Sequence, residues 1–314
     1  MRVDIASARS VNSERRAVNK FQTLLEKSNV VIADGAMGTM LQAAGLPAGE
    51  PPVVWNAEHP DRVRAVHRAY LDAGAQILIT NTFVGSRFRL AKHNLQARTH
   101  ELNRVGAQIL CDEIDRAGVD VIAAGDIGPS GELLAPLGAL SFDDAVAGFA
   151  EQARALIEGG VAVIWTMTHS DLEEARAVIE GVRRVSKDIP ILASLTFDTR
   201  GRTMMGVKPE TAARSLLDWG AAAIGGNCGS GPEEILAVIQ KMRAVAPNAI
   251  LIAKSNAGKP EMVDGKTVFP ATSEVMAQSA RELRDAGARI IGGCCGTTPA
   301  HIRAMAEAVR GSGK

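Results

Sequence analysis

Three of the four cysteines of this 314-residue chain lie in two glycine-rich stretches. Cys294 and Cys295 are adjacent in IIGGCCGTTP, and Cys228 lies in GGNCG. Three thiolates that converge on one point suit Zn²⁺, whose catalytic sites keep three protein ligands and leave a fourth position for water or substrate. Neighbouring residues of a regular strand point to opposite faces, so an adjacent pair can share one ion only where the strand has broken into a turn. The flanking glycines permit that turn, and the pattern therefore predicts a zinc site.

Other interpretations of the cysteines stay open at this stage. The adjacent pair could be two small core residues or a strained disulfide between neighbours. The two glycines before it could belong to a phosphate-binding loop, as loops near the end of many barrels do. The fourth cysteine, Cys111, lies in the helical pattern RVGAQILCDEI and is expected to be a core thiol outside the site.

Eight short apolar runs alternate with longer amphipathic stretches along the chain. Each run is nearly uniformly apolar, as a strand buried on both faces should be. Eight βα units in series predict one α/β domain, a (β/α)8 TIM barrel. Residues 28–314 are predicted to form the barrel and residues 1–27 an N-terminal extension, with an extra helix at 11–27 against the barrel floor. The predicted strands are 30–33, 76–80, 121–125, 161–166, 190–195, 221–226, 249–254 and 289–293.

Polar residues collect directly after the predicted strands. The carboxyl ends of all eight strands surround one mouth, so the ends of strands six and eight bring Cys228 near the later cysteine pair. The segments 43–59 and 126–141, predicted to be irregular, and the segment 254–272 reach the same face. The other polar residues at the strand ends include Asp34 and Gly35, Asn81 and Thr82, Asp126, Thr166 to Asp171, Asn227, Ser255 and Asn256.

The composition excludes several classes of partner. Thirty-five basic residues balance thirty-five acidic ones, so no net field favours nucleic acid or an anionic membrane. The chain contains no apolar run of about 18 residues and no apolar segment near its start of the kind that a secretory signal needs. Four cysteines are too few for a disulfide framework in a chain of this size. We therefore expect a cytoplasmic protein that acts on small molecules.

Seven motifs together resemble the homocysteine S-methyltransferases, from about residue 28 to about residue 310. The resemblance implies a (β/α)8 barrel with Zn²⁺ held by Cys228, Cys294 and Cys295. It also implies that Asn256 fills the open position of the metal before substrate arrives, and that Asp34 lies beside the substrate. The motifs are DGAMGTML (34–41), TNTF (80–83), GPSGELLAPLG (128–138), FDTRGRTMMG (197–206), GGNCG (225–229), SNAGKPE (255–261) and GGCCGTTPAHI (292–302).

One position departs from the family. Around strand four the family commonly shows a pattern like WIETMSDLEEA, whose glutamate holds the substrate's ammonium group. Residues 165–175 here read WTMTHSDLEEA, which places Met167 where that carboxylate should be. A methionine cannot bind an ammonium ion as a carboxylate does. Either Asp34 and backbone carbonyls recognise the amino acid alone, or the substrate thiol lacks an α-amino group, or the natural glutamate was replaced.

The predicted function is zinc-dependent transfer of a methyl group from a small donor to the thiol of homocysteine, which forms methionine. A metal that binds a thiol as thiolate overcomes its pKa of about 8.5. Betaine, sulfonium and S-methylmethionine donors are favoured, with Trp55 and Phe83 as candidate aromatic walls. The alternatives are another small thiol without an α-amino group and a subunit linked to a separate corrinoid protein; a homo-oligomer is also left open. The predicted substrate contacts are Asp34, Gly35, Asn81, Thr82, Met167, Thr168 and Asn256.

Overall fold

The computed structural model describes residues 20–198, 200–263 and 266–310. Eight parallel strands form one sheet in the order β1-β10-β7-β6-β5-β4-β3-β2. The strands are β1 (Val31–Ile32), β2 (Ile77–Ile79), β3 (Ile122–Ile127), β4 (Val163–His169), β5 (Ile191–Leu195), β6 (Ala223–Cys228), β7 (Leu251–Ser255) and β10 (Ala288–Gly293).

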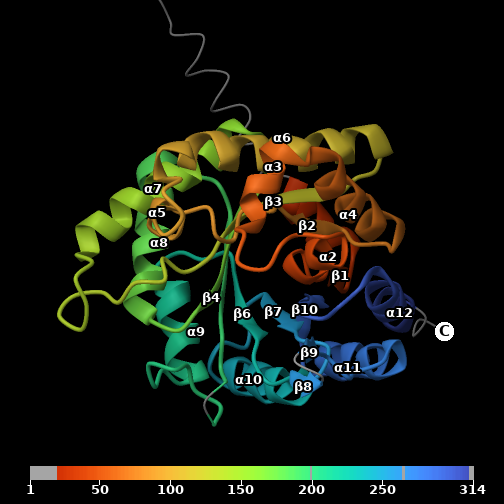
Figure 1. The fold of residues 1–314 in the computed structure, drawn as a ribbon. Coiled ribbons are helices and arrows are strands. Elements are labelled where there is room, and N and C mark those ends of the chain that lie inside the picture. Colours follow the sequence, from red (N-terminus) through yellow and green to blue (C-terminus); the bar gives the residue numbers. More distant parts are fainter. Residues whose placement is uncertain (1–19, 199, 264–265, 311–314) are drawn as a thin grey trace, which may run out of the picture.

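The sheet closes on itself between its two end strands. Ala33 and Ile77 form a parallel bridge, and the amide of Gln76 donates to the carbonyl of Ile32 at 2.6 Å. The amide of Asp34 donates in turn to the carbonyl of Ile77 at 3.0 Å. The predicted (β/α)8 barrel is therefore confirmed, and Figure 1 looks into its mouth.

Helices surround the barrel because the strands are buried on both faces. Several helices begin as the sequence indicated: Ser141, Asp171 and Thr272 each accept a backbone N–H at a helix start, and α9, α10 and α12 open on proline. The helices of the outer layer are α4 (Pro60–Asp72), α6 (Thr99–Ala117), α7 (Phe142–Glu158), α8 (Leu172–Val185), α9 (Pro209–Asp218), α10 (Pro232–Val245), α11 (Ser273–Asp285) and α12 (Pro299–Arg310).

The interior of the barrel is packed with side chains from alternate strand positions. Phe21 and Leu24 belong to this inner cluster and are almost fully buried. They come from a helical segment at residues 20–27, so this segment packs against the barrel floor as the sequence predicted. Residues 11–19 of the predicted helix lie outside the described residues. The division of the chain at residue 27 stays a prediction.

The segments at the mouth contain more regular structure than predicted. The segment 43–59 was expected to be irregular, but it includes a 3-10 turn, η1 (Pro52–Val54), and the short helix α3 (Trp55–Glu58). Short helices α2 (Gly38–Ala43) and α5 (Arg87–Ala91) and the turn η2 (Gln96–Arg98) also belong to the first two βα connections. β3, β4 and β6 continue two or three residues further than predicted, so Asp126, Met167 and Cys228 lie within strands.

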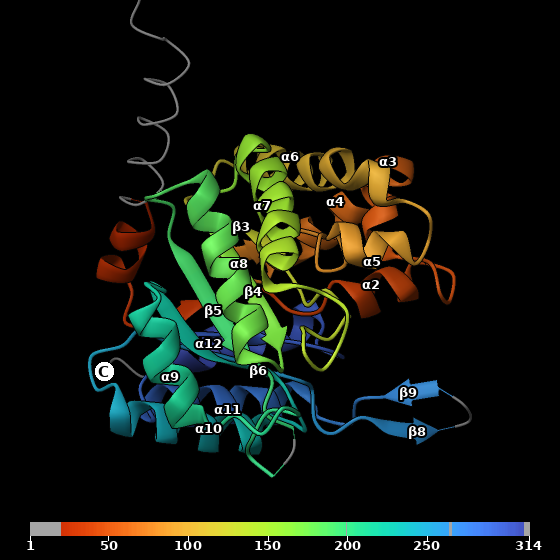
Figure 2. The same cartoon turned by 90° about the vertical axis from the view of Figure 1, so that its left-hand side faces the viewer.

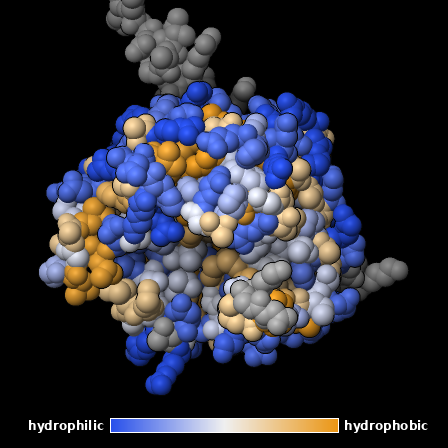
Figure 3. Space-filling model, viewed as in Figure 1, coloured by the Kyte–Doolittle hydropathy of each residue, from blue (hydrophilic) through white to orange (hydrophobic). Residues whose placement is uncertain are grey.

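A two-stranded hairpin follows β7 and projects from the barrel (Figure 2). It consists of β8 (Glu261–Val263) and β9 (Lys266–Val268), which pair antiparallel. Met262 and Val268 of the hairpin are exposed, as are Leu133 and Leu137 of the β3–α7 loop. Figure 3 shows apolar surface over both regions on the mouth face. In the part of the chain that the structure describes, no helix combines the length and the apolar character of a membrane span.

Candidate active site

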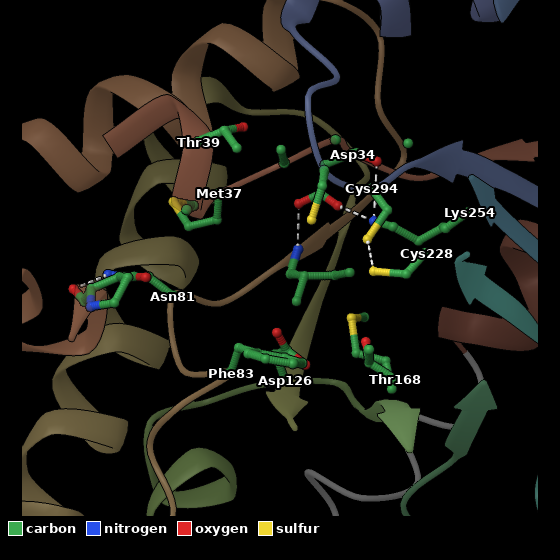
Figure 4. Close-up of a pocket in the computed structure, with 18 of the residues that line it drawn as sticks. Asp34, Met37, Thr39, Asn81, Phe83, Asp126, Thr168, Cys228, Lys254 and Cys294 are labelled. Carbon is green, nitrogen blue, oxygen red and sulfur yellow. Dashed lines mark hydrogen bonds and ion pairs between the residues drawn. The ribbon is translucent and has the colours of Figure 1, made fainter. Parts of the chain in front are cut away.

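A cavity of about 290 Å³ opens at the mouth of the barrel. It lies where the sequence placed the polar strand ends, and three of the four cysteines line it. Figure 4 shows Asp34, Asp126, Thr168, Cys228 and Cys294 around this cavity. The carboxyl ends of β1, β3, β4, β6, β7 and β10 therefore contribute to one site, as expected for a parallel barrel.

The three cysteines predicted to bind metal come together. One sulfur from each lies within 4.8 Å of the other two, and the Sγ atoms of Cys228 and Cys294 are 2.8 Å apart. Sulfur ligands around one tetrahedral Zn²⁺ lie about 3.8 Å apart, given Zn–S bonds of about 2.3 Å. The convergence of the three sulfurs and the all-sulfur donor set therefore fit a single zinc ion, around which Cys228 and Cys294 would stand about 1 Å further apart. All four cysteines are free thiols, so the alternative of a disulfide between neighbours is not the arrangement found.

The backbone is bent at both cysteine loops. Cys228 has a φ of +60°, in the left-handed region that few non-glycine residues adopt, and Gly229 continues it with a φ of +71°. Gly296, next to the cysteine pair, has a φ of +77°. The chain thus leaves its strand geometry at each cysteine, which is the break that the sequence argument required for two neighbours to face one point.

Asn256 links the two cysteine loops. Its Nδ2 donates to the carbonyl of Gly229 at 2.7 Å, and its Oδ1 accepts from the amide of Cys295 at 3.0 Å. The amide of Cys294 donates to the carbonyl of Ser255 at 2.7 Å. Asn256 therefore fixes the spacing of Cys228 and Cys295 through their backbones. Its direct role as a metal ligand stays a prediction.

The thiols share hydrogen bonds that separate their pKa values. The hydrogen bond from Cys228 and a second from Cys295 lower the pKa of Cys294 well below the usual range of a thiol. The same bond to Cys294, in which Cys228 is the donor, raises the pKa of Cys228. The hydrogen bonds thus favour ionisation at Cys294, which lines the cavity together with Cys228 and Cys295.

Asp34 forms a buried ion pair with Lys254. The Nζ of Lys254 donates to Asp34 Oδ1 at 2.7 Å and to the Asp34 carbonyl at 3.1 Å, and both side chains are at most 3% exposed. The other carboxylate oxygen accepts from the amide of Ile79 at 2.8 Å. Burial raises the pKa of Asp34, and Lys254 opposes that rise. The predicted substrate role of Asp34 is therefore joined by a structural one, because it ties together β1, β2 and β7.

Sequence reasoning missed Lys254 as a site residue. It ends the apolar run AILIAK, where a buried lysine needs an acidic partner. Its ammonium group also lies 5.2 Å from the ring centre of Trp165, which points into the barrel. The lysine at the end of this apolar run could have predicted a charged group inside the mouth of the barrel.

Asp126 is a second buried carboxyl in the cavity wall and was not among the predicted substrate contacts. It is 5% exposed, and its Oδ1 has no hydrogen-bond partner among the described residues. Burial raises the pKa of Asp126 well above its usual range, although Lys254 acts in the opposite direction. Its backbone is fixed, since Thr80 Oγ1 accepts from its amide and Thr82 Oγ1 donates to its carbonyl.

Met167 and Thr168 line the cavity at an irregularity of β4. The pairing of β4 with β5 shifts between Met167 and His169, and Thr168 has a φ of +68°. The side chain of Asn227 holds this bulge, because it accepts from the Thr168 amide at 2.9 Å and donates to the Thr168 hydroxyl at 2.7 Å. Met167 is 6% exposed and belongs to the apolar cluster inside the barrel.

His169 is fully buried away from the cavity. It contacts Thr166 Oγ1 at 2.7 Å and Glu174 Oε2 at 2.9 Å. Glu174 also accepts from the amide of Ser130 at 2.8 Å. This network ties β4 to α8 and to the β3–α7 loop, so the histidine is structural.

The remaining predicted substrate contacts line the cavity, and two of them also hold neighbouring segments in place. Gly35 lines the cavity, and a side chain there would meet Thr297 Oγ1 at 2.6 Å. Asn81 also lines it, but its amide donates to the Pro52 carbonyl at 2.7 Å and so supports the first loop. Thr82 borders the cavity while its hydroxyl is bonded to β3.

The aromatic wall proved smaller than expected. Phe83 lines the cavity, whereas Trp55 is 2% exposed in the outer core and is not part of the wall. Asn256, another predicted substrate contact, is not among the residues that line the cavity. Of the two aromatic candidates, therefore, one contacts the cavity.

Three convergent thiols at the mouth of a parallel (β/α)8 barrel form a donor set that suits a metal ion. Comparison with known proteins names the class: the sequence model described as homocysteine S-methyltransferase matches residues 31–309, and the chain belongs to that family.

Curated relatives include two methionine synthases. The one from Mycobacterium tuberculosis is 31% identical over 294 residues, which cover 89% of this chain and 24% of that protein. The one from Mycobacterium leprae is 28% identical over 314 residues, which cover 96% of this chain and 26% of that protein. The chain thus spans about a quarter of the length of these relatives.

Solved structures support the fold. The metallated form of the homocysteine methyltransferase MmuM from Escherichia coli has a TM-score of 0.77 and 24% identity, and the match covers 91% of this chain and 98% of that one. A methyltransferase from Methanosarcina mazei has a TM-score of 0.60 and 11% identity, and the match covers 94% of this chain and 98% of that one.

Proposed function

We propose that this chain is a zinc-dependent S-methyltransferase that transfers a methyl group from a small donor to the thiol of homocysteine and forms methionine. The observation that carries the proposal is the group of three sulfurs within 4.8 Å of one another beside a cavity of about 290 Å³. The family, the methionine synthase relatives and the metallated Escherichia coli homologue support it.

The residues of the chain have separate tasks in this reaction. Cys228, Cys294 and Cys295 would hold Zn²⁺, which when bound supplies a Lewis-acidic position that keeps the substrate sulfur as a thiolate at neutral pH. Asn256 sets the distance between the two cysteine loops. Met167 and Phe83 provide apolar wall that keeps water from the reacting atoms.

The group transfer is a displacement at the methyl carbon. The substrate sulfur forms a bond to that carbon while the bond between carbon and the donor heteroatom breaks, and the electron pair of the broken bond stays with the donor. A cationic donor leaves as a neutral molecule, so no general acid is required. A single aromatic residue, Phe83, in the described wall gives a quaternary ammonium group little of the aromatic cage it prefers, which disfavours betaine.

A second candidate function has the same chemistry and a different acceptor. Met167 stands at the position of the family carboxylate, and this favours a small thiol without an α-amino group. A separate corrinoid protein as methyl source and a homo-oligomeric assembly stay predictions. A donor panel that includes betaine, S-methylmethionine, S-adenosylmethionine and methylcobalamin distinguishes these routes.

Metal content and turnover test the proposal together. We expect purified protein to hold about one zinc per chain by elemental analysis and to form methionine with at least one donor of the panel. Cys294→Ala should lose most of both. Cys111→Ala is the matched control, because Cys111 is a thiol of α6 packed against the outer core. Zinc content and turnover that survive in Cys294→Ala would contradict the proposed centre.

A further inference from the structure

Asp126 is a buried carboxyl whose Oδ1 has no hydrogen-bond partner within the described ranges of the chain. Oδ1 is sealed from solvent without a hydrogen bond, and the residue lines the cavity that holds the cysteines. A buried polar atom without a partner loses its bonds to water and gains none in return, so native proteins keep few of them. The backbone of Asp126 is fixed on both sides by Thr80 and Thr82, so the side chain cannot easily leave the wall.

Lys254, the buried cation of the cavity wall, is already paired with Asp34. Lys254 donates to the carboxylate and the carbonyl of Asp34 at 2.7 and 3.1 Å, and its ammonium group stands over Trp165. Asp34 in turn accepts from Lys254 and from the amide of Ile79. Of the two carboxylates in the cavity wall, Asp34 is therefore satisfied by the protein and Asp126 is not.

Asp126 lies near Met167, the position at which the family has a carboxylate. β3 and β4 pair in parallel, and Asp126 lies opposite Trp165, two residues before Met167. Trp165 and Met167 both face the barrel interior. Neighbouring strands are about 4.8 Å apart and successive inward residues about 6.6 Å apart, so the carboxyl sits one strand across and one layer below Met167. Both residues border the same cavity.

We propose that Asp126 binds the primary ammonium group of the thiol substrate and so replaces, from β3, the carboxylate that β4 lacks at position 167. This inference rests on the proposed function, because it concerns the acceptor of the methyl group. It makes an α-amino thiol the substrate class and disfavours a thiol without an amino group.

The chemistry of the orphaned oxygen selects an ammonium group over the cation of the donor. A buried carboxylate oxygen needs a hydrogen-bond donor, and a primary ammonium group carries three. A sulfonium or quaternary ammonium group has no N–H and interacts best with aromatic faces. The methyl-bearing cation of either donor would therefore leave Oδ1 of Asp126 unsatisfied. S-Methylmethionine also carries a primary ammonium group, so the thiol is titrated alone, without a donor.

A pair of ligands that differ in one group tests this assignment. The full zinc-loaded chain is titrated calorimetrically with homocysteine and with 4-mercaptobutanoate, which is the same molecule without the amino group. We expect homocysteine to bind about 10- to 100-fold more tightly, the range given by a charge-assisted hydrogen bond. Asp126→Asn, of nearly equal volume, should abolish that preference by weakening homocysteine and leaving 4-mercaptobutanoate within about twofold.

Two further variants separate recognition from folding. Asp126→Asn combined with Met167→Glu should regain the preference for homocysteine, because it returns a carboxylate to the cavity. Asp143→Asn, on the exposed start of α7, is the matched control and should leave both affinities unchanged. Zinc content is measured for every variant.

The results that would overturn the assignment of Asp126 differ from those that would overturn the proposed function. Equal affinities of the unaltered chain for the two thiols, or an Asp126→Asn variant that weakens both alike, would overturn the assignment of Asp126 while the thiol methyltransferase function stands. If the unaltered zinc-loaded chain binds neither thiol, the proposed function itself fails and the assignment fails with it.

Discussion

The buried pair of Asp34 and Lys254 gives a quantitative test of how the mouth is held together. The two side chains are 2–3% exposed and their charged atoms are 2.7 Å apart. Removal of one partner of a buried pair leaves an uncompensated charge and costs about 3–5 kcal/mol. Lys254→Met, which keeps an unbranched apolar chain over Trp165, should therefore destabilise the protein by that amount.

The expected loss can be converted into a melting temperature. An unfolding entropy of about 2.1 cal/mol/K per residue gives roughly 0.66 kcal/mol/K for a chain of 314 residues. The cost of Lys254→Met then corresponds to a fall of about 5–8 °C. The double variant Asp34→Asn, Lys254→Met removes both charges, and it should recover at least half of the loss because no ion remains buried.

Calorimetric melting of the four proteins in the cycle, at neutral pH and equal metal content, measures the coupling. A coupling energy of about 2 kcal/mol or more is expected between these positions. A Lys254→Met variant that melts within about 1 °C of the unaltered protein, or two single effects that simply add in the double variant, would refute the view that this pair holds β1 to β7.

Two other changes test the supports of the site. Asn256→Ala removes both hydrogen bonds between the cysteine loops, and we expect zinc affinity to fall about 10-fold in a chelator competition. Asn256→Asp keeps the acceptor oxygen and should lose less. Equal zinc affinity in all three proteins would contradict the bridging role of Asn256. Glu174→Gln tests the buried network of β4. Burial would raise the pKa of Glu174, but hydrogen bonds from His169 and Ser130 outweigh it, so the pKa in the folded state lies below the usual value. The stability that depends on this carboxylate is present above pH of about 4.5 and is lost as pH falls through the folded pKa. Denaturant unfolding should therefore show Glu174→Gln destabilised by about 1–3 kcal/mol at pH 7, with the difference shrinking below pH 4; a difference independent of pH would count against an ionised Glu174.

The barrel could be predicted from the sequence because its strands leave a strong and simple pattern. A strand with helices on one face and barrel interior on the other is apolar throughout, and all eight such runs are strands in the structure. The convergence of Cys228 with the later pair followed from the same argument, since strand ends in a closed barrel meet whatever their separation in sequence.

Partner choice among the polar side chains could not be predicted in this way. Asp34 and Lys254 are 220 positions apart, and nothing in either local sequence says that one neutralises the other. The extra length of the strands at the mouth was missed because backbone hydrogen bonds continue past the point where side chains turn polar. The hairpin after β7 had a signal, the dipeptide DG between two short β-prone runs, that was not used.

The charges at the mouth explain why a carboxylate on β3 can serve as well as one on β4. Three cysteine thiolates around one Zn²⁺ carry a net charge of −1, and the Asp34–Lys254 pair adds none. Burial raises the pKa of Asp126, and a bound ammonium group would favour its ionised form, which adds a further −1 to the same cavity (Figure 4). An α-amino thiol that spans the cavity would direct its sulfur toward the cysteines and its ammonium group toward Asp126, so the cationic group of the ligand meets an anionic one. Met167 can then remain apolar, because the position it occupies needs only to shape the wall between these two ends.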